Sequence, residues 1–375
     1  MRLLHVYSGN LFGGIEVALI ALARHRAFCP DLVQEVALCF DGRLCEELER
    51  TGIRVHRLPA LRASRPHTVA RARRALAALV EHESFDRVVC HAAWSQALFG
   101  GVVRRARIPL VFWAHDAMTG RHWTERLARR VPPDFAICNS RFTAAALKSI
   151  YADVPSTVIA CALDVEAPSL TVAELADIRA TLHTKDDHVV IMQASRLEPW
   201  KGHTVLLEAL GQLADQRDWV CWIVGGAQRR AESTYEASLR ELTRRLGIVD
   251  RVRFVGERTD VPRLLAAADI YCQPNVGAEP FGVVFIEALA AGLPAVASAI
   301  GGPTDIITDA CGRLVPPGDA SALSATLRTL VADGSLRRQL GRAAPRRARQ
   351  LCDPPTQIRR LYEALEEPMR SAVSA

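Results

Sequence analysis

Short, wholly apolar segments alternate with longer helical segments along most of the 375-residue chain, and the alternation restarts near its middle. A strand that is apolar on both faces must be covered on both faces, which is typical of a parallel sheet between helices. We therefore predict an α/β fold with two Rossmann-like, doubly wound domains. The predicted strands are 3–7, 35–40, 87–90, 110–115, 135–140 and 156–160 in the first series, and 188–195, 219–225, 252–256, 269–274, 294–298 and 312–318 in the second.

The stretch between the two series is polar and, apart from one short helix, shows no periodicity. We predict a linker at 166–185, an N-terminal domain at 1–165 and a C-terminal domain at 186–353. A last helix, at about 355–375, can pack on either domain, including back on the N-terminal one. Ligands of open parallel sheets bind outside the carboxyl ends of the strands, so a cleft between the two domains is the expected site.

Positive charge is concentrated in the first half. Residues 1–165 contain 22 Lys and Arg against 15 Asp and Glu, whereas the remainder contains 25 against 26, and residues 51–80 contain seven arginines and no acid. One interpretation is a face that docks on anionic lipid near a lipid-linked acceptor. An anionic polymer acceptor or a merely solvated surface are the alternatives, and we do not expect nucleic acid as the partner.

The ten cysteines include no Cys-x-x-Cys pair, and several end apolar runs, which indicates buried free thiols rather than disulfides or zinc ligands. The N-terminus leads directly into a predicted strand without an apolar leader, and no apolar stretch reaches the ~18 residues that span a bilayer. We expect a cytoplasmic protein, with peripheral contact at the inner face of the membrane as a possibility.

The strongest local signal is EPFGVVFIEA (279–288), which follows a predicted strand and turn. Pro280 and Gly282 delay the helix until about residue 282, so Glu279 lies in the loop before it and Glu287 more than one turn inside it. Free N–H groups at a helix N-terminus suit a phosphate, and carboxylates suit sugar hydroxyls. The alternative is a solvated turn acid and a paired helix acid.

A second signal, QASRLEPWKGH (193–203), places Arg196 and Lys201 in the turn after the first strand of the second series. Lys201 is one of only three lysines in the chain. A guanidinium and an ammonium beside a helix N-terminus form a candidate diphosphate clamp. Two solvated loop cations are the alternative.

The first domain offers two weaker signals. SGNLFGGIE (8–16) is a glycine-rich turn that does not fit G-x-G-x-x-G, although Gly13 and Gly14 permit close approach of a ligand. His115 ends a predicted strand, where it is either a ligand contact or a structural histidine. The sequence contains no metal-ligand spacing, no Walker A loop and no D-x-D, so we predict phosphate binding by cations and amides without a metal or other cofactor.

In this combination the motifs resemble the retaining glycosyltransferases of family four, which have the GT-B fold of two Rossmann-like domains facing a central cleft. The resemblance runs from residue 13 to about 330 and is loose in the first domain, where it consists of G-G-x-E, the histidine and N-S-R-F-T (139–143). Its specific part is in the second domain. The matching positions are R-x4-K-G (196–202), Gly225, V-R-F-V-G (252–256), E-P-F-G with a second Glu (279, 287), A-x-G-x-P-x-V-A (290–297) and G-G (301, 302).

The resemblance implies a metal-independent hexosyltransferase that takes the sugar from a UDP-, GDP- or ADP-linked donor to a glycan or lipid-linked acceptor in cell-surface polysaccharide or glycolipid synthesis. It implies catalytic roles for His115, Arg196, Lys201 and Glu279, with the two cations on the diphosphate and the histidine on the transferred sugar. The implied donor contacts are Glu287 at the ribose, the amides of Phe281, Gly282 and Val283 at the sugar and its distal phosphate, Val255 to Arg258 at the base, Gly13 and Gly14 at the phosphates, and Gly225.

Two other functions stay open at this stage. One is a nucleotide-sugar epimerase on the same architecture, although we cannot assemble its catalytic set from this sequence. The other is a sugar-nucleotide-binding protein that performs no transfer.

Overall fold

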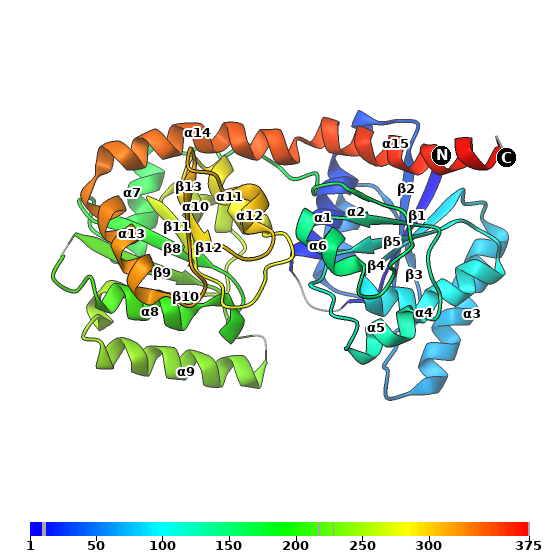
Figure 1. Cartoon of the computed structure of the whole chain (residues 1–375), viewed down its shortest axis with the longest axis horizontal. Coiled ribbons are helices and arrows are strands. Elements are labelled where there is room, and N and C mark those ends of the chain that lie inside the picture. The colour runs from blue at the N-terminus through cyan, green and yellow to red at the C-terminus, as the bar shows by residue number, and fades with distance from the viewer. Residues whose placement is uncertain (10–12, 217, 228, 374–375) are drawn as a thin grey trace. The chain divides into compact units, whose positions relative to one another are not determined.

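The computed structural model describes residues 1–9, 13–216, 218–227 and 229–373, with only the backbone of 367–373 (Figure 1). The chain divides into two compact units, Met1–Asp164 with Cys352–Ala375, and Val165–Leu351. Each unit is built around one parallel sheet that lies between helices. The prediction of two Rossmann-like domains is therefore confirmed.

Within the described residues, the sheet of the first unit has seven strands in the order β3-β2-β1-β4-β5-β6-β7. These are β1 (Arg2–Tyr7), β2 (Val33–Leu38), β3 (Arg54–Arg57), β4 (Arg87–His91), β5 (Leu110–Ala114), β6 (Phe135–Cys138) and β7 (Ser156–Val158). The helices are α1 (Gly14–Arg24), α2 (Arg43–Arg50), α3 (Pro66–His82), α4 (Ala92–Arg105), α5 (Trp123–Ala128), α6 (Arg141–Leu147) and α15 (Pro354–Val373).

Helix α15 completes this unit from the far end of the chain. Its Ile358 and Leu361 are fully buried in one apolar cluster with Val89 of β4 and Val111 of β5. Burying such side chains stabilises a fold by roughly 1.5–3 kcal/mol each, so the helix contributes substantially to this core.

The sheet of the second unit has six strands, among the described residues, in the order β10-β9-β8-β11-β12-β13. These are β8 (Val189–Ala194), β9 (Trp219–Val224), β10 (Val252–Gly256), β11 (Ile270–Gln273), β12 (Ala295–Ser298) and β13 (Gly312–Val315). The helices are α7 (Val172–Thr181), α8 (His203–Gly211), α9 (Arg230–Arg245), α10 (Val261–Ala266), α11 (Val283–Ala290), α12 (Pro303–Ile306), α13 (Ala320–Ala332) and α14 (Gly334–Cys352).

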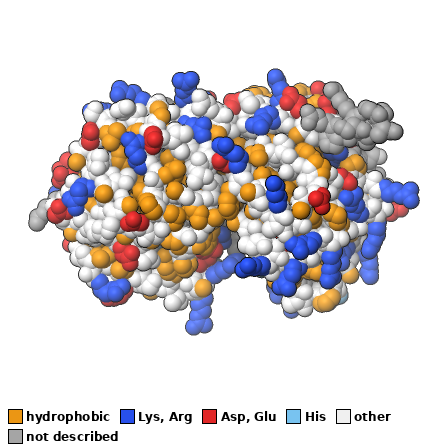
Figure 2. All heavy atoms as spheres, viewed as in Figure 1, with side chains coloured by type: hydrophobic (Ala, Val, Ile, Leu, Met, Phe, Trp, Pro, Cys, Tyr) orange, Lys and Arg blue, Asp and Glu red, His pale blue; other side chains and the backbone are white. Residues whose placement is uncertain are grey.

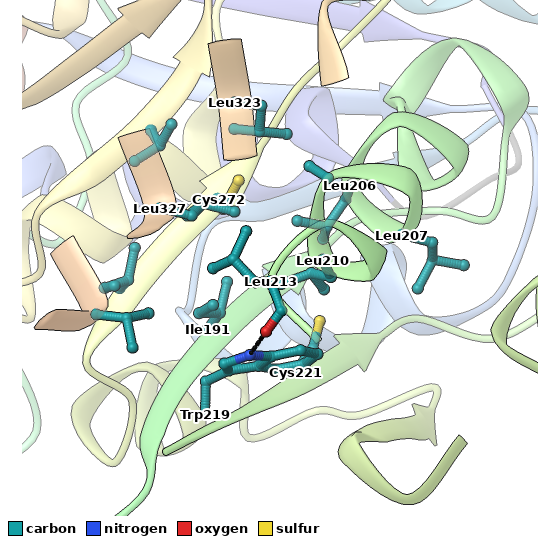
Figure 3. Close-up of a cluster of buried hydrophobic side chains, with 14 of the residues drawn as sticks. Ile191, Leu206, Leu207, Leu210, Leu213, Trp219, Cys221, Cys272, Leu323 and Leu327 are labelled. Carbon is teal, nitrogen blue, oxygen red and sulfur yellow. Dashed lines mark hydrogen bonds between the residues drawn. The ribbon is translucent and has the colours of Figure 1, made fainter. Parts of the chain in front are cut away.

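The central strands of this unit are almost wholly apolar because they lie in its core. All residues of β8 and β9 are buried, and the two strands pair in register from Val189 with Trp219 to Ala194 with Val224. Figure 3 shows Trp219 beneath leucines of α8, with its indole N–H donating to the carbonyl oxygen of Leu213 at 3.1 Å. A buried indole needs such a partner, since an unpaired N–H in the core is costly.

The segment predicted as a linker belongs to the second unit. Helix α7 lies within 166–185, and its Arg179 pairs with Asp269 at 2.8 Å and donates to the carbonyl oxygens of Ala267 and His188. These contacts fix the helix at the amino-terminal end of β11, so we count Val165–Leu351 as one unit.

The prediction of buried free thiols is confirmed. All ten cysteines are free thiols, and nine of them are buried. Among the described residues, no helix is both long and apolar enough to cross a bilayer, and no group of three or more acidic, histidine or cysteine side chains is arranged to hold a metal ion.

Candidate functional site

Two loops of the second unit meet at the carboxyl ends of the neighbouring strands β8 and β11. The first loop ends at Gly202, whose φ is +77°, and the second begins at Pro274. A Cβ atom on Gly202 would lie 1.8 Å from the Pro274 carbonyl oxygen. Glycine is therefore required here for two reasons, its left-handed backbone and the close approach of the second loop.

This approach brings together Lys201 and Glu279, which the sequence places 78 residues apart. The Nζ atom of Lys201 lies 2.5 Å from Oε2 of Glu279, and the side chains are only 13% and 12% exposed. The same Oε2 accepts hydrogen bonds from Nε2 of Gln273 at 3.2 Å and Nδ2 of Asn275 at 3.1 Å. No described residue donates a hydrogen bond to Oε1 of Glu279, so that oxygen can accept one from a ligand hydroxyl.

The buried side chain of Tyr271 fixes the orientation of these amide groups. Tyr271 donates its hydroxyl hydrogen to Oε1 of Gln273 at 2.7 Å, which turns Nε2 of Gln273 towards Asn275 and Glu279. Burial raises the pKa of Tyr271 well above its ordinary value, and the charges of Glu279 and Glu287 raise it further. The hydroxyl therefore stays a donor at all ordinary pH values.

Sequence reasoning missed Gln273 and Asn275. Both are almost fully buried, at 3% and 1% exposure, at the end of a strand that is otherwise apolar. Polar amides at such positions must be hydrogen-bonded, so the QPN sequence at 273–275 was the available signal.

The backbone around Glu279 is held by the turn after β12. Gly302 donates its N–H to the carbonyl oxygen of Glu279 at 2.7 Å, and a Cβ on Gly301 would lie 2.4 Å from the same oxygen. Gly282 caps helix α11 with φ +106°. The predicted helix start at about 282 is thus observed, with Glu279 in the loop before it and Glu287 half-buried within it.

The amides that the resemblance assigns to the donor lie at this helix start. Phe281 is buried, and Val283 is the first residue of α11. The first N–H groups of a helix have no partner within it and carry partial positive charge, which suits a phosphate.

Arg196 lies in the same loop as Lys201 but has its own acid. Its Nη2 is 3.1 Å from Oε2 of Glu198, which also accepts a hydrogen bond from the Trp200 indole at 2.9 Å. The Lys201 ammonium in turn lies 4.0 Å from the centroid of the Trp200 ring, a favourable cation–π distance. Trp200 therefore contacts the Lys201 ammonium directly and shares Oε2 of Glu198 with Arg196. The described residues show no direct contact between the two cations.

Gly225 brings the ends of three strands together. Its φ is +142°, a Cβ there would lie 2.0 Å from the Ser195 carbonyl oxygen, and its N–H donates to the Gly256 carbonyl oxygen at 2.9 Å. Val255, just before Gly256 in β10, is half-buried. The ends of β8, β9 and β10 therefore form a continuous backbone surface.

The Arg258 side chain forms an ion pair with Asp260 and lies beside helices α7 and α10. Its guanidinium donates to both oxygens of Asp260 at 2.7 and 2.6 Å, and the side chain lines a shallow pocket with α7 and α10. Because Asp260 already binds this guanidinium in a forked geometry, a role towards a nucleotide base stays a prediction that rests on backbone groups at 255–258.

The predicted glycine turn of the first unit is held by a buried acid. Gly13 caps α1 and donates its N–H to Glu16 at 2.8 Å, and the other oxygen of Glu16 accepts from the Tyr7 hydroxyl at 2.5 Å. Gly14 is the first residue of that helix. Residues 10–12 of the predicted turn lie outside the described part of the chain.

His115 directly follows β5 and is 6% exposed. Its Nε2 forms a hydrogen bond with Nδ1 of His91 at 2.9 Å, and its ring stacks on those of His91 and Trp113. His115 therefore makes the contacts of a structural histidine, which is one of the two interpretations that the sequence allowed. A role towards a transferred sugar stays a prediction.

Comparison with known proteins covers nearly the whole chain. The family described as "Glycosyl transferases group 1" matches residues 176–347, and "Glycosyltransferase Family 4" matches residues 12–167. The phosphatidyl-myo-inositol mannosyltransferase of Mycobacterium leprae is 35% identical over 45% of this chain and 44% of its own length. A GDP-mannose-dependent monoacylated alpha-(1-6)-phosphatidylinositol monomannoside mannosyltransferase of Corynebacterium glutamicum is 29% identical over 72% of this chain and 73% of its own.

Among solved structures, Anabaena Alr3699/HepE in complex with UDP-glucose is similar to this chain, with a TM-score of 0.87 and 26% identity. That match covers 98% of this chain and 100% of the Anabaena chain. By contrast, the chain spans about half of the length of the first curated relatives, with matched shares of 44%, 38% and 51%.

Proposed function

Because the chain belongs to the group 1 glycosyltransferases of family 4, we propose that it moves a hexosyl group from a nucleotide-diphosphate sugar to a hydroxyl of a glycan or lipid-linked acceptor. The observation that carries this proposal is the arrangement around Glu279. One carboxylate oxygen is occupied by Lys201 and two amides, and the other is left for a sugar hydroxyl beside the start of α11.

The proposed chemistry needs no metal and no protein base. The bond between the anomeric carbon and the phosphate oxygen breaks, and the acceptor oxygen bonds to that carbon on the same face. The acceptor proton passes to the departing phosphate oxygen, so the configuration is retained. Negative charge grows on the diphosphate during this step, and Lys201, Arg196 and the N-terminus of α11 stabilise it more in the transition state than in the ground state.

Glu279 has a positioning role in this proposal. Its charge is neutralised by Lys201 at 2.5 Å, and its free oxygen fixes the sugar by accepting a hydroxyl hydrogen. When the diphosphate binds, the two remaining N–H groups of Lys201 can donate to phosphate oxygens without breaking its bond to Glu279. Arg196 must share its guanidinium between Glu198 and the phosphate, which its fork of donors allows.

The donor is the first point to test. Alr3699/HepE was solved with UDP-glucose, whereas the Corynebacterium relative is named as GDP-mannose-dependent. We propose thermal shift with UDP-glucose, GDP-mannose and ADP-glucose, because a ligand at 100 times its Kd stabilises a fold by about 2.7 kcal/mol. We expect the donor with one of the three nucleotide bases to raise the Tm clearly more than the other two donors.

Product analysis then separates the three functions. A transferase releases nucleoside diphosphate and, without acceptor, a little free sugar. A binding protein without transfer releases neither, and an epimerase returns an altered nucleotide sugar. Failure to release nucleoside diphosphate with every donor that binds would reject the transferase proposal.

We further propose that helix α5 gives this protein peripheral contact with an anionic membrane. Trp123 and Leu127 on this short helix are 47% and 37% exposed, and exposed arginines at 126 and 130 lie beside them. Figure 2 shows Lys and Arg side chains gathered on the same part of the first unit. Exposed aromatic side chains flanked by arginines are typical of interfacial binding. Co-sedimentation with vesicles that contain or lack anionic lipid tests the contact.

A further inference from the structure

A fully buried glutamine interrupts the apolar face of β8. Val189 and Ile191 belong to the core cluster that also contains leucines of α8, and because side chains alternate along a strand, Gln193 continues the same face. The Gln193 side chain is 0% exposed. A buried amide costs free energy unless it is hydrogen-bonded, and an apolar residue would fill this core position without that cost. The reason for Gln193 must therefore lie in what its amide holds.

The amide of Gln193 binds the backbone of Lys201. Its Nε2 donates to the Lys201 carbonyl oxygen at 2.9 Å. This contact fixes which end of the amide faces the loop, because a carbonyl oxygen only accepts and the opposite orientation would place two acceptors against each other. Oε1 of Gln193 is then a buried acceptor without a partner among the described residues, which is less costly than a buried N–H in that state.

The Lys201 carbonyl oxygen depends on this donor. Pro199–Lys201 is a short 3₁₀ turn, and because Gly202 after it has a φ of +77°, the turn does not continue into α8. The first backbone bond of α8 runs from the N–H of Leu206 to the carbonyl oxygen of Gly202, and no N–H of the described backbone donates to the Lys201 oxygen. Without Gln193, this oxygen would have no hydrogen-bond partner among the described residues.

Lys201 is therefore held at its backbone and at the tip of its side chain. Gln193 of β8 holds the carbonyl group, and Glu279 in the loop after β11 holds the ammonium at 2.5 Å. The start of α8 is fixed separately, by a 3.2 Å hydrogen bond between Oγ of Ser195 and Nε2 of the buried His203. Burial and the charge of Lys201 lower the pKa of His203 to about 4, so this neighbour adds no second charge beside the ammonium near pH 7.

We propose that Gln193 is a positioning residue that holds the Lys201 ammonium in place for the departing diphosphate. The role of Lys201 towards a diphosphate rests on the proposed function, whereas the anchoring of its backbone by Gln193 does not. Negative charge that grows on a leaving group is stabilised best by a cation that is already in place, and a displacement of about 1 Å can cost on the order of 10²-fold in rate. Without the Gln193 amide, the loop can shift and the flexible lysine stem can move with it.

The anchoring can be measured in the full-length protein without any substrate, because the chain has only three lysines. Lys148 and Lys185 are exposed, whereas the Lys201 side chain is 13% exposed. In ¹⁵N-lysine-labelled protein at pH 7, exposed ammonium groups exchange their protons with water too fast to be seen by NMR. We expect one slowly exchanging ammonium signal, from Lys201, which Lys201→Met should remove. Absence of that signal from the unsubstituted protein would overturn the proposal, and this outcome requires no variant to fold.

Gln193→Met gives the second arm, with Gln96→Met as the matched control. Methionine keeps the length of the side chain and removes the amide. Gln96 of the first unit is also 0% exposed, and its Nε2 donates to the Val131 carbonyl oxygen at the same distance, 2.9 Å. Both variants should lower the Tm, because each leaves a carbonyl oxygen without its donor.

Only Gln193→Met should speed the exchange of the Lys201 ammonium protons. The expected change is about tenfold, the factor by which one hydrogen bond shifts an equilibrium. An unchanged exchange rate in Gln193→Met, or an equal change in Gln96→Met, contradicts the proposal. Gln193→Leu, which also lacks the amide, replaces Gln193→Met if that variant does not fold.

Kinetics connects Gln193 to the reaction. With a donor that the protein turns over, kcat/KM should fall about 10²-fold in Gln193→Met. Most of the loss should be in kcat, because Arg196 and the start of α11 still bind the diphosphate of the ground state. Gln96→Met should leave the KM for the donor unchanged. A higher KM with an unchanged kcat, or no kinetic effect, in Gln193→Met would contradict the positioning role. If no donor is turned over at all, the proposed function fails, while the ammonium signal still decides whether Gln193 anchors Lys201.

Discussion

Replacing Lys201 with methionine separates the structural role of the pair with Glu279 from its proposed catalytic role. Methionine keeps most of the apolar stem of the side chain but removes the ammonium, which lies 2.5 Å from Glu279 and 4.0 Å from the centroid of the Trp200 ring. Glu279 would then be an almost buried carboxylate that retains only the two amide donors of Gln273 and Asn275.

The size of the effect follows from these contacts. A hydrogen bond to a charged group contributes about 1.5–3 kcal/mol, and both side chains are less than 15% exposed, so we expect Lys201→Met to destabilise the second unit by about 2–3 kcal/mol. For a unit of this size that corresponds to a Tm lower by roughly 5–10 °C. Adding Glu279→Gln removes the unpaired charge and keeps an acceptor for the amides. The double variant should therefore return to within about 1 kcal/mol of the original stability.

Activity should not return with stability. Each lost donor to a developing anion costs roughly 10²–10³-fold in turnover, so Lys201→Met and the double variant should both be nearly inactive. The assay is calorimetry together with release of nucleoside diphosphate. Lys185→Met, at an exposed lysine of the same unit, is the matched control and should change stability by less than about 0.5 kcal/mol. An unchanged Tm in Lys201→Met, or additive losses in the double variant, would refute the argument from the pair.

Three further outcomes are expected. Gly202→Ala should abolish donor binding, because its Cβ meets a carbonyl oxygen at 1.8 Å, whereas Gly318→Ala, with φ +78° and open space around it, should cost only about 1–2 kcal/mol in urea unfolding. Trp123→Ser should weaken binding to anionic vesicles about tenfold, and Val172→Ser, an exposed apolar residue of the other unit, should not. The free energy of unfolding of the first unit should fall as the pH drops from 6.5 towards 4, by up to about 1.4 kcal/mol per pH unit from His5, because burial lowers the pKa of folded His5 to about 4 while the unfolded chain takes up a proton near pH 6.5; a flat profile in pH-dependent unfolding would contradict this.

The fold was predictable because its strongest signals are local. Every predicted strand segment contains or overlaps an observed strand, since wholly buried strands such as β8 and β9 must be apolar on both faces. Among the strands of the described residues, the one that was missed is β3, whose sequence RVHR is polar and partly exposed at the edge of the sheet. An edge strand can pair with its neighbour without an apolar composition, and β3 then gives no signal in a search for apolar runs. The other edge strands, β7, β10 and β13, do contain apolar residues and were predicted.

The candidate site was predictable only in part, because contacts between distant residues decide it. Spacing placed Glu279 before a helix and Lys201 after a strand, and both positions are observed. Their contact depends on Gly202, whose positive φ and lack of a Cβ are visible only once the second loop is in place. The hydrogen bond between the buried side chains of His5 and His91 was missed for the same reason, because the two residues are 86 positions apart and each alone resembles a polar interruption in an apolar strand.

Cationic side chains of the two units differ in exposure and in ion pairing, and this difference bears on the basic surplus of the first half. Within 51–80, Arg54 and Arg57 pair with glutamates and Arg73 donates to backbone carbonyls, while the other arginines of this stretch are exposed and form no ion pair with any described residue. Charges of that kind act at long range and are screened by salt. Lys201, the cation of the proposed donor site, is instead almost buried beside the Glu279 carboxylate, where salt screens its charge little. Under the proposed function, we therefore expect salt to weaken contact with an acceptor or a membrane more than it weakens donor binding.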